Sequence, residues 1–187
     1  GPEVIARLGP RLDHPEPSIR TLAIECHAHP ANAAEDGPGL RERLGTDREC
    51  AYYVVRALGR LRHREAAPDL IALHPKAAPL EKVAIIEALG AIGTPAAVRF
   101  LETELHGRDR ERRRAAAAAL AKHHREGRLP AFLKLARAED WALRNTAAWA
   151  LGELGSEDAV PVLKKLTSDP EEVVARTARS ALEKLGS

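Results

Sequence analysis

The chain has 187 residues and a formal net charge of +2, with 29 Lys and Arg against 27 Asp and Glu. Because basic and acidic residues nearly balance, the net charge gives no basis for a nucleic-acid-binding protein. No apolar run approaches the ~20 residues that a membrane-spanning helix needs. Hydrophobic residues make up 44% of the chain but aromatic residues only 3%. Alanine and aliphatic side chains must therefore fill the core. Methionine is absent and the chain opens with Gly1-Pro2, which is typical of a protease-cleavage scar, so we expect a segment of a longer protein.

One sequence pattern recurs every 31 residues along the chain. A leucine followed by Gly, Ala or Glu marks it, and the residue before that leucine is small. The marker leucines are Leu58, Leu89, Leu120, Leu151 and Leu182, and the small column is Cys26, Ala57, Ala88, Ala119, Ala150 and Ala181. A period of this length is typical of solenoid proteins, whose repeats bury their apolar faces by stacking on one another.

Helical spacing inside each period predicts two antiparallel helices per repeat. In the repeat 139–169, the apolar stripe of the first helix comprises Leu143, Ala147, Ala150, Leu151 and Leu154. Acidic residues that suit the start of first helices are Glu16, Asp47, Asp109, Asp140 and Glu171. Glycines that suit their ends are Gly93, Gly155 and Gly186, and N-cap types for second helices are Asn32, Thr94 and Ser156.

We predict an all-α fold in a single domain spanning 1–187. It is an α-solenoid of antiparallel helix pairs, wound as a right-handed superhelix of about twelve helices. Its parts are a partial repeat 1–14, full repeats 15–45, 46–76, 77–107, 108–138 and 139–169, and a half repeat 170–187.

These repeats resemble the HEAT-like repeats of the phycobilisome-lyase type, and the resemblance covers essentially the whole chain. The best match runs from Asp140 to Leu166, with Leu143-Arg144, Ala147-Ala148, Ala150-Leu151-Gly152, Leu154-Gly155 and Ala159-Val160-Pro161 in place. The resemblance implies a protein-binding scaffold, because that is what this family mostly supplies.

Three branches of the resemblance lead to alternatives. Deoxyhypusine hydroxylase binds iron through paired His-Glu motifs, and no His is followed by Glu in this sequence. Lyase-type subunits attach bilin chromophores to phycobiliproteins. The more distant alkylpurine DNA glycosylases use a helical-repeat groove with Trp and Asp, a comparison that Asp140-Trp141 and Trp149 invite. The alternatives to a scaffold are therefore an accessory or catalytic subunit of a lyase-type enzyme, and a DNA-binding repeat protein.

Charged residues on the first helices have a structural interpretation. One basic column comprises Arg20, Lys82, Arg113 and Arg144. Three of its members follow an acidic residue by four positions, as Arg20 follows Glu16, so intrahelical ion pairs are expected. The resemblance adds a role for this Arg as a strut between repeats. The basic run 110–114 predicts a solvated face that carries Arg110 and Arg114.

No arrangement of residues predicts catalysis, a metal ion or another cofactor. Adjacent helical residues point about 100° apart, so His123-His124 suit one metal ion poorly, and we expect a satisfied, partly buried pair. Cys26 ends one first helix and Cys50 starts the next, so their separation of ~10 Å exceeds the ~7 Å limit of a disulfide. Two free thiols fit a cytoplasmic location.

The predicted binding face is formed by the second helices, which line the concave surface of HEAT-like arrays. The basic residues that point away from the core there are Arg41, Arg99, Lys134, Arg137, Lys164 and Lys165. Acidic Asp69, Glu102 and Glu104 lie nearby, and the balance turns basic toward the C-terminal end. Trp149 falls in a solvent column of the first helices and is a further candidate contact with a partner protein.

We therefore predict a non-catalytic protein–protein interaction scaffold that binds its partner along the concave groove. A protein partner with an acidic segment suits the basic end of that groove. We expect neither nucleic acid nor a membrane as the partner. Rigid repeats offer a large surface with little ordering cost on binding.

Overall fold

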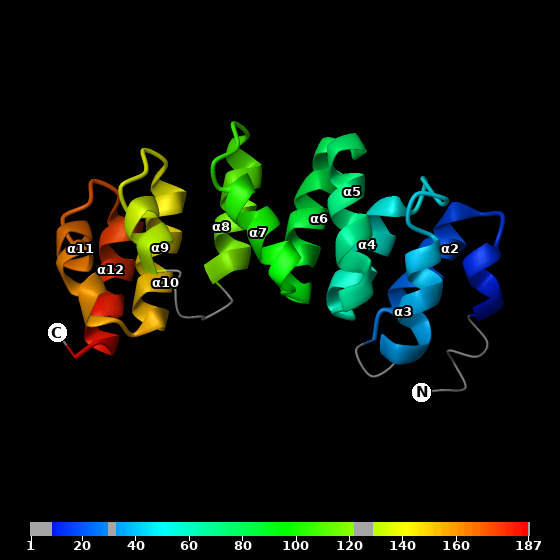
Figure 1. The fold of residues 1–187 in the computed structure, drawn as a ribbon, viewed down its shortest axis with the longest axis horizontal. Helices are drawn as coiled ribbons and strands as arrows, with labels where there is room; N and C mark the ends of the chain where they lie inside the picture. The colour runs from blue at the N-terminus through cyan, green and yellow to red at the C-terminus, as the bar shows by residue number, and fades with distance from the viewer. Residues whose placement is uncertain (1–8, 30–32, 122–128, 187) are drawn as a thin grey trace. The chain divides into compact units, whose positions relative to one another are not determined.

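The computed structural model describes residues 9–29, 33–121 and 129–186, and all regular structure in those ranges is helical. Eleven α-helices lie in them, where about twelve helices were predicted (Figure 1). The first helices of the repeats are α2 (Pro17–His27), α4 (Ala51–Arg60), α6 (Pro79–Ile92), α8 (Arg110–Ala121), α10 (Trp141–Leu154) and α12 (Glu172–Lys184). The second helices are α3 (Ala33–Glu42), α5 (Ala67–Leu73), α7 (Pro95–Glu104), α9 (Leu129–Leu135) and α11 (Val160–Leu166). The all-α repeat fold is confirmed.

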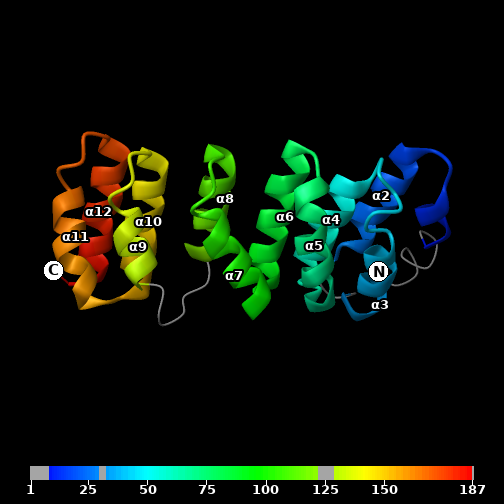
Figure 2. The ribbon, with the colours of Figure 1, turned by 45° about the horizontal axis from the view of Figure 1, so that its top comes forward.

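The chain divides into two compact units, residues 1–104 and 105–187. In the first unit α4 lies beside α6, and α5 packs against α7 (Figure 1). In the second unit α10 packs against both α8 and α12, while α9 covers α10 and α11 covers α12 (Figure 2). Each unit is thus a stack of helix pairs. A single domain and a right-handed superhelix over the whole chain stay predictions.

The 31-residue register reappears in the helix boundaries. Four successive first helices begin at Pro79, Arg110, Trp141 and Glu172. All five marker leucines are buried, as are the five alanines of the small column. Cys26 is the exception in that column because it is exposed. Within the described residues α2 follows only the short 3-10 helix η1 (Gly9–Asp13), so no earlier first helix covers this thiol.

Small residues let the first helices approach closely. A Cβ atom added to Gly59 in α4 would lie 2.8 Å from the Cα of Ala88 in α6. The same atom on Gly152 in α10 would lie 2.6 Å from the Cβ of Ala181 in α12. Both glycines follow a marker leucine, and both alanines precede the next one. The recurring sequence pattern therefore encodes the spacing between neighbouring first helices.

The predicted helix ends are confirmed in part. Gly93 and Gly155 end α6 and α10 in the left-handed conformation, with φ of 65° and 68°. Asp140 caps α10 by accepting a hydrogen bond from the backbone N–H of Ala142. Glu16 and Glu171 also stand at N-cap positions, of α2 and α12, but their side chains make no capping hydrogen bond. Glu is not among the residues favoured at the N-cap, since its longer side chain places the carboxylate poorly for the first free N–H groups.

Candidate functional site

Arginine side chains join consecutive repeats at their turns. In the second unit, Nη1 of Arg144 donates to the carbonyl oxygens of Ala138 and Glu139 at 2.9 and 2.7 Å. Its Nε and Nη2 atoms donate side-on to the two carboxylate oxygens of Asp169 at 2.7 and 2.9 Å. The Asp169 side chain is only 4% exposed. One guanidinium therefore ties the start of α10 to the turn that precedes α12.

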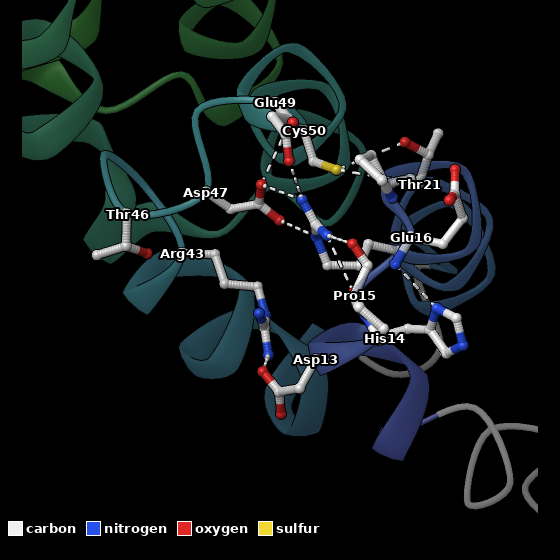
Figure 3. A network of polar contacts seen from close by, with 12 residues as sticks. Asp13, His14, Pro15, Glu16, Thr21, Arg43, Thr46, Asp47, Glu49 and Cys50 are labelled. Carbon is white, nitrogen blue, oxygen red and sulfur yellow. Dashed lines mark hydrogen bonds and ion pairs between the residues drawn. The ribbon is translucent and has the colours of Figure 1, made fainter.

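Arg20 forms the corresponding strut in the first unit. Its Nη1 donates to the carbonyl oxygens of His14 and Pro15, both at 3.0 Å. Its Nε donates to Asp47 at 2.8 Å and its Nη2 to Asp47 and Glu49 at 3.1 and 2.7 Å (Figure 3). The cross-repeat strut that the resemblance implied is what the structure shows.

The intrahelical ion pairs expected for this column are not formed. Arg20 pairs with Asp47 instead of Glu16, and Arg144 pairs with Asp169 instead of Asp140. The reason is geometric, because each chosen carboxylate lies in a half-buried turn where it meets the guanidinium side-on, and such bidentate pairs are stronger than single exposed contacts.

The Asp140 carboxylate instead accepts hydrogen bonds from two other arginines. It accepts from Nε of Arg110 at 2.8 Å and from Nε and Nη2 of Arg114 at 3.0 and 2.9 Å. The Arg114 guanidinium also lies 5.7 Å from the ring centre of Trp141. Burial raises the pKa of Asp140, but the two arginines and the N–H of Ala142 outweigh it and hold that pKa well below its usual range. The predicted solvated face was wrong for Arg114, whose side chain is only 26% exposed.

The struts predict a loss of stability in acid. Hydrogen bonds from Arg144 hold the pKa of Asp169 below its ordinary value, and those from Arg20 do the same for Asp47. Between the folded and unfolded pKa values the unfolded chain binds more protons, so this stabilisation is complete above the unfolded value of about 3.9 and is lost as the pH falls through the folded value. We expect the urea midpoint to hold from pH 7 to 5 and to fall below pH 4. Asp169→Asn should lower the midpoint at pH 7 and flatten the fall, and an unaltered profile in this variant would contradict the assignment.

The second helices of the first unit border a mixed-charge hollow of about 940 Å³. Arg41 of α3 lines it and donates through Nε to Asp69 of α5 at 2.5 Å. The other basic residues in the lining are Arg62, Arg64 and Lys76, and the other acidic residues are Glu42 and Glu65. Arg41 and Asp69 neutralise each other within this lining, so its acidic residues are not neutralised from outside.

The second unit has a hollow of about 520 Å³ that we name the α9 hollow. Its charged lining consists of Arg113, Lys134, Arg137, Glu139 and Asp140, together with His106. Leu105 and Leu143 are buried beneath it. Lys134 and Arg137 are exposed, and Lys134 occupies the same position in its repeat as Arg41 does three repeats earlier. The structure thus brings together two of the predicted basic residues.

The remaining predicted residues lie elsewhere. Arg99 is exposed on α7 of the first unit, and Lys164 and Lys165 are exposed on α11 of the second. Trp149 is 39% exposed on α10, beside Arg176 of α12. It belongs to the first helices, as predicted, and its contact with a partner stays a prediction. His123 and His124 lie outside the described residues.

Sequence spacing gave no reason to single out Arg113, because the whole basic column was expected to pair within its own helices. The register alone gave no signal, because the position of Asp169 holds Ala138 for Arg113 and Gly45 for Arg20, and Arg20 is nevertheless paired. In the described ranges no group of three or more His, Cys, Asp and Glu residues is placed to hold a metal ion. No helix in those ranges has both the length and the apolar character needed to cross a membrane.

Comparisons with known proteins agree with the repeat fold. A designed armadillo repeat protein in complex with the peptide (KR)4 is 18% identical with a TM-score of 0.67, over 97% of this chain and 99% of that one. An engineered protein is 21% identical with a TM-score of 0.62, over 97% and 96%. Human deoxyhypusine hydroxylase in complex with glycerol is 18% identical with a TM-score of 0.50, over 100% and 85%. At these identities the likeness concerns the fold alone.

The sequence itself gives the family. No curated protein matches the chain. A family model of HEAT repeats, however, matches residues 37–121 and again 100–183, which together make up well over half of the sequence. With the helix pairs recurring in the same register, the chain belongs to the HEAT repeat family.

Proposed function

We propose that this chain is a non-catalytic interaction scaffold that binds an acidic segment of a partner protein on its second-helix face. The observation that carries the proposal is the cationic lining of the α9 hollow. Within the described ranges neither Lys134 nor Arg137 takes part in an ion pair, whereas Arg41 in the first unit is paired with Asp69. Charges without a partner of their own are the ones available to a ligand.

The acidic residues beside the α9 hollow leave it net positive. Asp140 is already neutralised by Arg110 and Arg114, neither of which lines the hollow. Glu139 is the other acidic residue in the lining, against three basic residues, Arg113, Lys134 and Arg137. The potential there therefore favours an anion, and a flexible acidic peptide can reach several of these charges at once.

The fold supports binding of an extended peptide. The similar designed armadillo repeat protein is in complex with a basic peptide, (KR)4. The α9 hollow has the opposite sign from the one that a basic peptide requires, so an acidic peptide suits this chain. Helix pairs held by buried leucines and arginine struts keep the hollow formed before binding, which reduces the entropy lost on association.

The proposal also places the chain in the phycobilisome-lyase subtype of HEAT-like repeats and in the cytoplasm. The Leu-Gly and Ala pattern and the struts at Arg20 and Arg144 support the subtype. Free thiols at Cys26 and Cys50 support a reducing compartment.

Charge reversal tests the proposal directly. The variant with Lys134, Arg137, Lys164 and Lys165 all changed to Glu should bind a fluorescein-labelled octapeptide of alternating Asp and Glu at least about tenfold more weakly, because its electrostatic attraction becomes repulsion. All four residues are exposed, so the thermal midpoint should change little. Fluorescence anisotropy at two salt concentrations measures the affinity.

The matched control separates a site from net charge. Lys134→Glu with Arg137→Glu is compared with Arg176→Glu and Arg179→Glu, which reverses two exposed charges on α12. The first pair should weaken binding much more than the second. Equal losses in both, or no binding of the peptide to the unaltered chain, would contradict the proposal. Tighter binding of duplex DNA with a steep salt dependence would replace the protein partner by nucleic acid.

A further inference from the structure

Three arginines occupy one position in their repeats, and backbone carbonyls orient all three alike. Nη1 of each donates to the carbonyl oxygens six and five residues earlier, at 3.0 Å for Arg20, at 3.1 and 2.9 Å for Arg113, and at 2.9 and 2.7 Å for Arg144. A guanidinium is planar, so two bonds at Nη1 also set the direction of its Nε–Nη2 edge. That edge of Arg113 is therefore held as it is in the two complete struts.

Arg113 differs from the other two arginines in the acceptor that its Nε–Nη2 edge finds. Arg20 and Arg144 each donate from Nε and Nη2 to a carboxylate of the next repeat, Asp47 and Asp169 respectively. The two struts take their carboxylates from different positions of the repeat. Ala138, whose methyl group accepts nothing, stands one repeat before Asp169, and Asp140 stands three repeats after Asp47. No carboxylate among the described residues bonds to Arg113, since the nearby Asp140 is taken by Arg110 and Arg114.

The incomplete strut opens into the α9 hollow. Arg113 and Ala138 both line it, together with Lys134 and Arg137. Arg113 is half-buried and lies above the buried side chain of Leu143, so water screens a pair formed there less than at an open surface. A side-on carboxylate would satisfy donors that this environment already holds in place.

We propose that Arg113 is the anchor of the acidic partner. An Asp or Glu side chain of the partner protein pairs side-on with Nε and Nη2, in the place that Asp169 takes at Arg144. Lys134 and Arg137 contact the acidic residues on either side of it. The inference rests on the proposed scaffold function and names the residue that gives it specificity for a carboxylate. The partner completes the strut that this repeat lacks.

Supplying the missing acid within the chain tests the anchor. Ala138→Asp in the full chain should pair with Arg113, raise the thermal midpoint and weaken binding of the labelled Asp-Glu octapeptide about tenfold or more. Ala138→Asn has the same shape without the charge and should weaken binding less than about twofold. Arg113→Lys keeps the charge but loses the bidentate geometry, so it should also weaken binding. The octapeptide of alternating Asn and Gln should not bind.

A double-variant cycle distinguishes a pair from a general charge effect. If Asp at 138 acts by occupying the guanidinium, its effect in the Arg113→Lys background should shrink, so the two losses are not additive. Additive losses, or unchanged affinity in Ala138→Asp, would overturn the anchor. If the anchor is overturned but charge reversal at Lys134 and Arg137 still abolishes binding, the proposed scaffold function stands without Arg113 as its anchor. An unaltered chain that does not bind the octapeptide overturns both.

Discussion

Gly152→Val should destabilise the second unit by about 3 kcal/mol, at the upper end of what overpacking costs. The new Cβ would lie 2.6 Å from the Cβ and 2.9 Å from the Cα of Ala181. Side-chain rotation relieves neither contact, because one atom is backbone and the other is attached to it directly. Helix α12 must therefore move away from α10, which opens the layer formed by the first helices.

Urea unfolding followed by helical circular dichroism measures this loss. Gly39→Val in α3 is the matched control, because a Cβ at Gly39 meets nothing within 4 Å. Glycine and valine differ by only a few tenths of a kcal/mol in helix propensity, so this control should be close to neutral. Adding Ala181→Gly to Gly152→Val removes the nearest atom and should restore part of the stability. Similar losses for the valines at 152 and 39 would show that the close approach of α10 and α12 does not limit stability.

The repeat register could be predicted because it depends on contacts that every repeat makes alike. Leu58 and Leu151 are fully buried in equivalent places, and Gly59 and Gly152 each face the alanine of the next repeat. A residue that meets the same neighbour in each repeat is constrained in the same way, so its type recurs in the sequence. Cys26 on α2 has no earlier first helix beside it among the described residues, and its side chain is exposed although the column is otherwise buried.

The pairing of the arginines could not be predicted from spacing. Arg20 has Glu16 one turn away on its own helix and Asp47 in the next repeat, and both distances along the sequence suit an ion pair. The choice of Asp47 depends on where the turn before α4 lies relative to α2, which the three-dimensional stacking decides. Helical periodicity identifies residues on one face but not the turn of the neighbouring repeat that faces them.

For the candidate site, too, the sequence predicted which residues are exposed but not which of them are paired. Periodicity placed Lys134 and Arg137 away from the core, and both are exposed. Periodicity also placed Arg41 away from the core, but it could not show that Asp69 on the next second helix pairs with Arg41. The proposed role of Arg113 follows only when the struts are compared. Arg144 is held by Asp169, whose position one repeat earlier is Ala138, and Arg20 is held by Asp47, whose position three repeats later is Asp140.

Arg144→Ala should cost about 3 kcal/mol, the lower end of the range for breaking a buried ion pair. It leaves the Asp169 carboxylate, which is 4% exposed, without the two donors that bind it side-on. It also removes the donor from the carbonyl oxygens of Ala138 and Glu139. The carboxylate then has little access to water and keeps only the backbone N–H of Glu171 as a donor, which is what makes such a loss large.

Arg113→Ala is the matched control for the stability lost in Arg144→Ala. Arg113 makes the same two carbonyl bonds but pairs with no carboxylate among the described residues, so its removal should cost less. The difference between the two alanine variants, measured by urea unfolding at pH 7, isolates the pairing with Asp169 from the bonds to the turn. Adding Asp169→Ala to Arg144→Ala removes the stranded charge and should recover part of the stability. If Arg113→Ala and Arg144→Ala destabilise the chain equally, the carboxylate contributes nothing to the strut, and a partner's carboxylate at Arg113 would then gain nothing from the same geometry.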